Sequence, residues 1–115
     1  MSERRPPAPC SSALRNGTVR TATAPVLRPR RPIAEKELLE MYRRYFERMP
    51  FVRVRESLPA TKDTAHTNFL DVAVRVVNGR IIVLACEDNL VRGASGVAVQ
   101  NFNRMYGHDE RTALL

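Results

Sequence analysis

The chain has 115 residues, which limits it to one domain of ordinary size. Its formal net charge of +7, from 19 basic and 12 acidic residues, is typical of proteins that bind nucleic acid. No apolar run approaches the ~18 residues of a membrane span, and the first residues lack the apolar middle of a secretory signal, so we expect neither.

The positive charge is concentrated in a proline-rich N-terminal segment. Residues 1–32 hold seven arginines, one acid and six of the eight prolines, a net charge of +6, whereas residues 33–115 are almost neutral at +1. The first segment cannot bury enough apolar surface to offset its ordering entropy. An organelle transit peptide has a similar composition, but its amphipathic helix would not tolerate six prolines. We therefore predict a disordered basic tail over 1–32 and one folded domain over 33–115.

The first predicted element of that domain is an amphipathic helix over residues 33–49. Its apolar residues recur at i, i+3, i+4, i+7 and i+8, which is the spacing of one helix face. They are Leu38, Met41, Tyr42, Tyr45, Phe46 and Met49. Acids in the first turn and arginines near the end complement the helix dipole, and Pro50 ends the helix.

Two strand regions are predicted next. Apolar and charged residues alternate over Phe51–Arg55, which indicates a short strand, and residues 60–68 are polar and turn-like. The strongest signal is a hairpin around Asn78-Gly79, because both positions of a two-residue type I′ turn need positive φ. The resulting pairs on one apolar face are Val76 with Ile81, Val74 with Val83 and Val72 with Ala85. The opposite face is mixed, so we expect it to be only partly covered.

Three residues near the ends of the hairpin have structural interpretations. Asp71 and Asp88 border the hairpin and are predicted to cap turns. Cys86 lies opposite Asp71 and is expected to be a small strand residue. Cys86 and Cys10 lack the spacing of a metal site, and unpaired thiols favour a reducing compartment. We therefore expect a cytoplasmic protein without a bound metal.

The last predicted helix runs from Ala94 to Tyr106, with Gly107 as its C-terminal stop. Its apolar stripe consists of Ala98, Phe102, Met105 and Tyr106. We expect this stripe to pack in the core and residues 108–115 to form a loose end. Helix, strand, hairpin and helix together predict an α+β fold, an antiparallel sheet with flanking helices. The ordered part, about 80 residues, is marginal for an independent core, which indicates part of a larger domain.

Five segments carry a specific family resemblance. They are "PFVRV", "LPATK", "HTNFLDVAV", "IIVLACEDNLVRGASGVAVQNFNRMYG" and "DERTALL". In this order and spacing, over residues 31–115, they resemble the C-terminal part of the N-acetyl-gamma-glutamyl-phosphate reductases, NADPH-dependent enzymes of arginine biosynthesis. The "DNLVRGASGVAVQN" block is also similar to aspartate-semialdehyde dehydrogenases, which share the fold. Val97 stands where Gln is common, and His66 and Ala113 stand where Gly is usual.

The resemblance implies a partial, dimerisation-type C-terminal domain of a semialdehyde-dehydrogenase-like α/β enzyme. The complete enzyme would reduce N-acetylglutamyl phosphate to the semialdehyde with NADPH and form homo-oligomers. The family's Gly-rich dinucleotide turn, its nucleophilic Cys in a "GCYPT"-like loop and its catalytic His have no counterpart in this sequence. We therefore predict no catalytic residue here, and neither activity nor NADPH binding by the chain alone.

The resemblance also implies a cofactor-binding site at the start of the last helix, which in the family lies near the nicotinamide. Small residues at a helix start expose backbone N–H groups to a ligand. The candidate residues are Asn89, Gly93, Ala94, Ser95 and Gly96. By composition alone, tight helix–sheet packing without a ligand is the simpler interpretation, and Gly96→Ala would then cost little stability.

Three other polar residues are expected to have no part in the site. Lys62 and Arg92 could meet a phosphate, but solvated surface is the expected place for both. His66, in a polar turn, is expected to be a surface or capping residue.

Two other functions stay open. A small basic protein could contact nucleic acid through its arginine-rich tail, although no specific nucleic-acid site is predicted because aromatic residues are not interleaved with the bases. A regulatory or assembly piece could instead pair its sheet with another chain.

Overall fold

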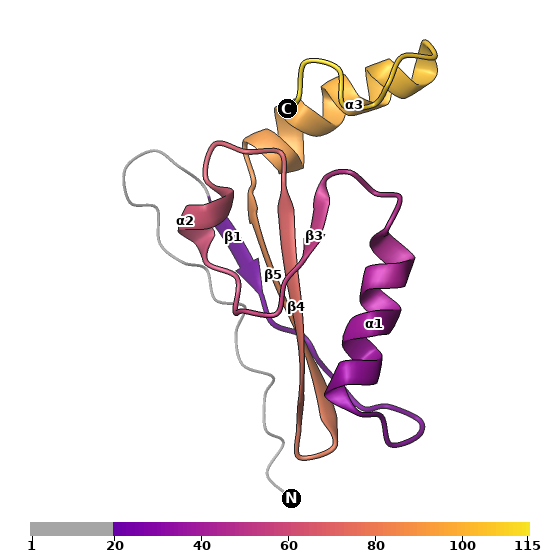
Figure 1. Ribbon diagram of the computed structural model, residues 1–115. Coiled ribbons are helices and arrows are strands. Elements are labelled where there is room, and N and C mark those ends of the chain that lie inside the picture. Colours follow the sequence, from indigo (N-terminus) through magenta and orange to yellow (C-terminus); the bar gives the residue numbers. More distant parts are fainter. Residues whose placement is uncertain (1–19) are drawn as a thin grey trace, which may run out of the picture.

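Residues 20–115, which the computed structural model describes, form a five-stranded sheet with helix α1 beside it and helix α3 projecting from its end (Figure 1). The strands are β1 (Arg20–Thr23), β2 (Val26–Leu27), β3 (Val52–Val54), β4 (Leu70–Val77) and β5 (Arg80–Asp88). The helices are α1 (Glu35–Phe46), α2 (Thr61–Thr64) and α3 (Gly96–Met105), and a π-helical turn, η1 (Val91–Ser95), leads into α3.

The strands lie in the order β1-β5-β4-β3, and β2 continues β1 along the same side of β5. All pairs in the described part of the chain are antiparallel except β3 with β4. This pair is parallel because the chain crosses back through residues 55–69, including α2, before it enters β4. The predicted α+β fold, with a mostly antiparallel sheet and flanking helices, is confirmed.

The predicted hairpin is present and has the predicted register. Asn78 and Gly79 have φ values of 49° and 71°, as a type I′ turn requires. All three predicted pairs on the apolar face are observed. Val72 and Val74 are buried on this face, and Ala73 is buried on the opposite face because the segment between β3 and α2 runs across it. The centre of the core therefore lies on β4.

The predicted tail over residues 1–32 is wrong for residues 20–27, which form an edge strand of the sheet. β1 and β2 pair with β5 in one continuous register. The Pro25 carbonyl accepts a hydrogen bond from the Val83 N–H at 3.1 Å, but proline has no N–H to return, so the ladder breaks between β1 and β2. The segment is short and mostly small residues, so its own pattern is too weak to predict a strand. The prediction for residues 1–19 lies outside the described residues.

Helix α1 is confirmed, but only part of its apolar stripe is covered. Leu38 is buried and Tyr42 and Phe46 are half-buried, whereas Met41 and Tyr45 remain exposed. The helix packs on β3 and β4 (Figure 1), and β3 has only three residues. The strip of sheet available to the helix is therefore narrow, and it leaves the outer part of the stripe in solvent.

The apolar stripe of α3 does not pack in the core, and that prediction is wrong. Phe102, Met105 and Tyr106 are 54%, 79% and 65% exposed, and Ala98 is exposed as well. The helix extends past the end of the sheet (Figure 1), so the other described elements do not cover this face. Gly107, with a φ of 73°, follows the helix end as predicted.

The C-terminal residues 108–115 fold back along α3, so the loose-end prediction is also wrong. The buried Asn103 side chain donates to the carbonyl oxygens of Glu110, at 3.4 Å, and Thr112, at 2.9 Å. The Asn68 side chain, from the loop before β4, donates to the Leu114 carbonyl oxygen at 3.0 Å. Hydrogen bonds from polar side chains, rather than contacts of the apolar stripe of α3, therefore hold the C-terminal segment in place.

Candidate cofactor site at the start of helix α3

Asp88, at the end of β5, fixes the turn that leads into α3. Its buried carboxylate accepts hydrogen bonds from the N–H groups of Leu90, at 3.1 Å, and Val91, at 3.3 Å. It also accepts one from the His66 N–H at 2.8 Å, across from the loop before β4. The prediction that Asp88 caps a turn is confirmed, and the carboxylate joins two loops as well.

Gly96 is the position where packing excludes a side chain. A Cβ there would lie 2.7 Å from the Val91 carbonyl oxygen and 2.9 Å from Cγ of Asn68, both closer than real contacts allow. The expectation that Gly96→Ala would cost little is therefore wrong, because backbone and a part-buried amide both stand in the way. Asn68 is a site residue that the sequence reasoning missed, and its place in the "HTNFLDVAV" motif is the signal that could have indicated it.

Gly93 differs from Gly96 because it is exposed. A Cβ there would meet the Asn89 side chain, with Cγ at 3.2 Å, and that side chain is exposed and able to move. Packing alone therefore does not require glycine at this position. The Asn89 side chain lies over Gly93, so a larger residue at position 93 would have to displace a mobile side chain rather than backbone.

Four of the five candidate residues are exposed around the start of α3, and the fifth is buried. The exposed ones are Asn89, Gly93, Ala94 and Ser95. Gly96 is buried. Gly96 allows α3 to approach the loop that contains Asn68.

Arg92 is held inside the junction between η1, α3 and β3. Its guanidinium donates to Gln100 Oε1 at 2.6 Å and lies 5.3 Å from the centre of the Phe51 ring, which is buried. The expectation of a solvated surface role is therefore wrong for Arg92. Lys62 is exposed, as expected.

Asp71 does not cap a turn, contrary to prediction, but forms a buried ion-pair centre. The fully buried carboxylate accepts from Arg53, at 2.5 Å and 3.0 Å, and from Arg55, at 3.1 Å. Both arginines come from the chain beside β4, and the Arg53 guanidinium also lies 4.3 Å from the Phe69 ring centre. Two cations offset one buried carboxylate, so these groups join β3 to β4.

Cys86 is a buried strand residue, as predicted. Burial, and then the nearby carboxylates of Asp71 and Asp63, raise the pKa of its thiol. A thiol that resists ionisation is a poor nucleophile. Residues 20–115 hold no group of three His, Cys, Asp or Glu side chains placed to bind a metal ion. Within the same residues, no helix has the length and apolar character needed to cross a membrane.

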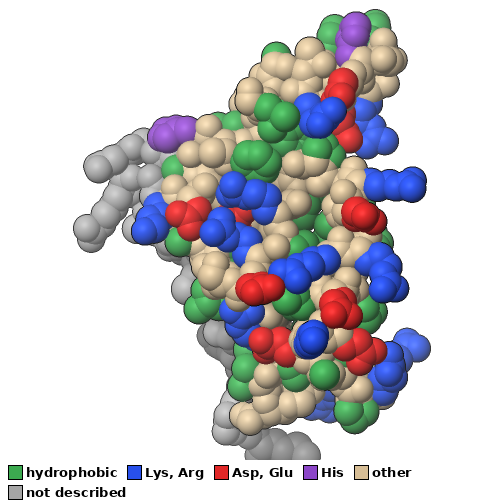
Figure 2. Space-filling model, viewed as in Figure 1, with side chains coloured by type: hydrophobic (Ala, Val, Ile, Leu, Met, Phe, Trp, Pro, Cys, Tyr) green, Lys and Arg blue, Asp and Glu red, His purple; other side chains and the backbone are tan. Residues whose placement is uncertain are grey.

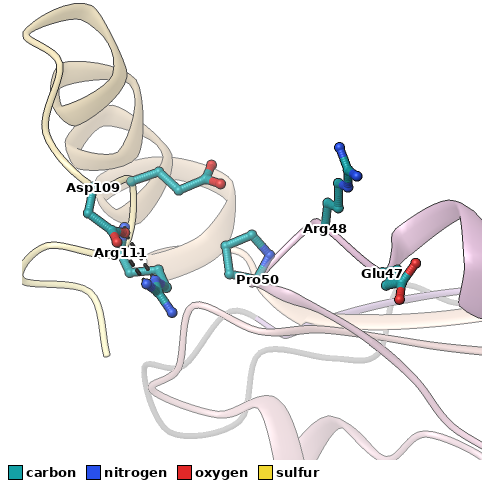
Figure 3. A pocket seen from close by; sticks show the side chains of 6 residues that line it. Glu47, Arg48, Pro50, Asp109 and Arg111 are labelled. Carbon is teal, nitrogen blue, oxygen red and sulfur yellow. Dashed lines mark hydrogen bonds and ion pairs between the residues drawn. The ribbon is translucent and has the colours of Figure 1, made fainter.

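A surface hollow of about 540 Å³ lies between the end of α1 and the C-terminal segment. Its walls consist of Glu47, Arg48, Pro50, Asp109, Glu110 and Arg111. Figure 3 shows Asp109 and Arg111 paired on one side and Arg48 directed outward on the other. The bonds from Arg111 lower the pKa of the Asp109 carboxyl, so these two charges are engaged with each other. The candidate cofactor residues do not line this hollow.

On the face of residues 20–115 that Figure 2 shows, basic and acidic side chains do not segregate into a basic patch. Figure 2 shows blue and red side chains interleaved over the visible face. Several form pairs, such as Arg43 with Glu56 at 2.6 Å. This pattern agrees with the near-neutral charge of residues 33–115.

The mostly antiparallel sheet with flanking helices is consistent with the dimerisation domain of a semialdehyde dehydrogenase. The family model of the semialdehyde dehydrogenase dimerisation domain matches residues 8–89, and the chain belongs to this family. The match begins well before residue 31, so the likeness extends further toward the N-terminus than the quoted motifs indicate. Of the candidate cofactor residues, only Asn89 falls within the matched stretch.

The particular relatives are named N-acetyl-gamma-glutamyl-phosphate reductase, which confirms the resemblance. The chain is 44% identical over 89 residues to the one from Dehalococcoides mccartyi, covering 76% of this chain and 26% of the relative. It is 51% identical over 83 residues to that of Desulforudis audaxviator, covering 69% and 24%. For Geobacillus kaustophilus the identity is 40% over 89 residues, covering 74% and 26%.

The chain therefore spans about a quarter of the length of the curated relatives it matches. These relatives give no support to the alternative of a small nucleic-acid-binding protein.

Proposed function

We propose that the chain is the C-terminal, dimerisation-domain part of an NADPH-dependent N-acetyl-gamma-glutamyl-phosphate reductase of the cytoplasm. The names and identities of its relatives support this assignment. In this role the chain contributes subunit contacts and one wall of the cofactor site, while the nucleophile and the dinucleotide turn belong to the rest of the enzyme. The chain alone is inactive.

The observation that carries this proposal is the uncovered apolar face of α3. Phe102, Met105 and Tyr106 lie more than half exposed, and Val99 is 38% exposed beside them. Full burial of an exposed apolar side chain contributes about 1.5–3 kcal/mol, so covering these partly exposed ones against another domain would contribute a fraction of that each. A dinucleotide domain, which the family resemblance places against this helix, would cover them and bring NADPH to the helix start.

The exposed surface at the helix start fits a polar ligand edge. The Asn89 amide offers both a donor and an acceptor, and the neighbouring Gly93 has no side chain to hold a ligand away. NADPH, when bound, would supply the hydride for the reduction. The residues of this chain would only bind and orient it.

An uncovered part of the sheet supports homo-oligomer formation. α1 packs on β3 and β4, and the apolar residues of β5 on the same face, Ile81, Val83 and Ala85, are only half-buried. Beside them Leu27 of β2 is 48% exposed. A second subunit laid on this face would remove apolar surface from water.

The proposal is tested by complementation. The Dehalococcoides mccartyi relative, shortened by the quarter that this chain matches, is mixed with the chain and assayed for NADPH oxidation with N-acetylglutamyl phosphate. We expect activity from the mixture and from neither part alone. Turnover by the chain alone, or none by the mixture, would contradict the proposal.

Two variants make the test specific to α3. Phe102→Asp places a charge on the exposed stripe of α3 and should abolish complementation. Tyr45→Asp places the same charge on α1, where the side chain is 71% exposed, and should leave it intact. Equal effects of the two variants would mean that α3 is not the docking face.

A further inference from the structure

Helix α3 and the C-terminal segment form one unit, which we call the α3 arm (residues 96–115). The Asn103 and Gln100 side chains donate to residues 110–112, and the His108 N–H donates to the Asn103 carbonyl oxygen at 2.8 Å. These hydrogen bonds lie within the arm. They order the segment along the helix without tying either to the sheet.

The arm has few contacts with the sheet, and two side-chain hydrogen bonds join it to the rest of the described chain. The Asn68 side chain lies against Gly96 and donates to the Leu114 carbonyl oxygen. Arg92, in η1, donates to Gln100 of α3 at 2.6 Å and lies 5.3 Å from the centre of the buried Phe51 ring. The apolar stripe of α3 faces solvent, so the arm lacks the hydrophobic burial that stabilises most helices in proteins.

Two features of the folded arm and its junction with the sheet are energetically unfavourable. Ala113 has a φ of 63°, a left-handed conformation in which any Cβ is crowded. Oδ1 of Asn68 is buried and has no hydrogen-bond partner among the described residues. Both are relieved when the arm unfolds, because Ala113 can then leave the left-handed region and Asn68 Oδ1 can accept a hydrogen bond from water. A detached helix of ten residues would not remain folded, because isolated helices of that length are marginal in water.

We infer that the α3 arm unfolds locally as a unit, with η1 as the hinge, while the β4–β5 hairpin stays folded. This goes beyond the proposed function, because it concerns the chain by itself and requires no ligand or partner. A domain that docks on the exposed apolar stripe of α3 would then order this helix. Local opening of this kind exposes its amides to hydrogen exchange.

The test is residue-resolved hydrogen exchange on the full chain. It is run under conditions where the arm closes faster than its amides exchange, so that each rate reports the equilibrium between open and closed forms. Amides of Ala98–Met105 should exchange faster than those of Val72–Val74, yet slower than in an unstructured peptide. Ala113→Gly should slow exchange in α3 about two- to five-fold, because it removes strain that only the closed arm suffers.

Two matched variants separate local opening from global unfolding. His66→Gly removes another left-handed side chain, with a φ of 59°, but from a loop outside the arm. Ile81→Val removes one methyl group from β5. We expect the first to slow, and the second to speed, exchange in the hairpin by about two- to five-fold, with α3 unchanged in both.

The inference is overturned if all three variants shift α3 and the hairpin in parallel, because α3 would then open only with the whole domain. It is also overturned if α3 exchanges at the rate of an unstructured peptide, or if the hairpin shows no protection.

Discussion

At the scale of single residues, two glycines three positions apart have different reasons for being glycine. Gly96 is buried, and the Val91 carbonyl and the Asn68 side chain leave no room for a Cβ. Gly93 is exposed and faces a movable Asn89 side chain. Packing therefore requires glycine at position 96 but not at position 93.

We predict that Gly96→Ala destabilises the chain by about 1–3 kcal/mol, because backbone has to move to admit the methyl group. Gly93→Ala should change the free energy of unfolding by less than about 1 kcal/mol, and in the stabilising direction, because alanine favours helical backbone. Urea unfolding of both variants measures the difference. Equal losses in the free energy of unfolding for the two variants would show that packing does not distinguish Gly96 from Gly93.

A second residue-scale prediction concerns Cys86, whose thiol has a raised pKa in the folded chain. The folded state then holds its proton more firmly than the unfolded state, so the contribution to stability is fully present below the ordinary value of 9.0 and is lost as pH rises above it. We expect the free energy of unfolding to fall as pH rises above about 9.

The control for this prediction is Cys86→Ala, which should flatten that part of the pH profile. Cys10 is present in both proteins and cancels in the comparison. Profiles of identical slope would show that the buried thiol does not contribute to the pH dependence.

At the scale of elements, β3 depends on side chains as much as on its backbone ladder. It has only three residues, and Arg53 and Arg55 extend from it and its end to the buried Asp71 of β4. A short parallel strand at a sheet edge forms few ladder hydrogen bonds. The ion-pair centre therefore adds an attachment that the strand length does not provide.

We predict that Asp71→Asn destabilises the chain by about 2–3 kcal/mol. The effect should be below the upper range for a buried pair, because the side chains of Arg53 and Arg55 are 36% and 35% exposed and water can reach them. Thermal or urea unfolding measures it. Arg43→Ala, which breaks only the exposed pair with Glu56, is the control and should cost less than about 1 kcal/mol. Similar losses of stability in Asp71→Asn and Arg43→Ala would contradict the role of the buried ion-pair centre in attaching β3 to β4.

At the scale of the whole molecule, the sheet is closed on one side by a strand from the arginine- and proline-rich part of the chain. β1 and β2 cover the edge of β5, and without them that edge would present unpaired N–H and C=O groups. The apolar face of α3 and the outer part of α1 remain open at the same time. The chain thus has its backbone pairing largely completed but part of its apolar surface uncovered.

We predict that a chain starting at residue 28 is less stable and more prone to self-association than one starting at residue 20. Removing β1 and β2 exposes the β5 edge, which another chain can pair with. Urea midpoints and sedimentation of the two proteins measure the difference. Indistinguishable behaviour would show that the edge strand contributes little.

The sequence by itself determined the parts of this protein whose signals are local. The Asn78-Gly79 turn requires positive φ at both positions, and the alternation around it sets the hairpin register, so both were predictable from the sequence. The periodicity of residues 33–49 likewise determined α1, and the motifs of residues 31–115 indicated the family. Periodicity identifies an apolar face of a helix, as it did for α3, but carries no information about what covers that face.

Only the tertiary structure decided the features that depend on distant partners. Residues 20–27 become a strand because β5 offers an unpaired edge. Gly96 is constrained by Asn68, which approaches it from the loop before β4, and Asp71 is an ion-pair centre because parallel pairing places Arg53 opposite it. The stripe of α3 is exposed because the helix extends past the end of the sheet. In each case the deciding contact joins segments far apart in the chain, so no local pattern of residues could encode it.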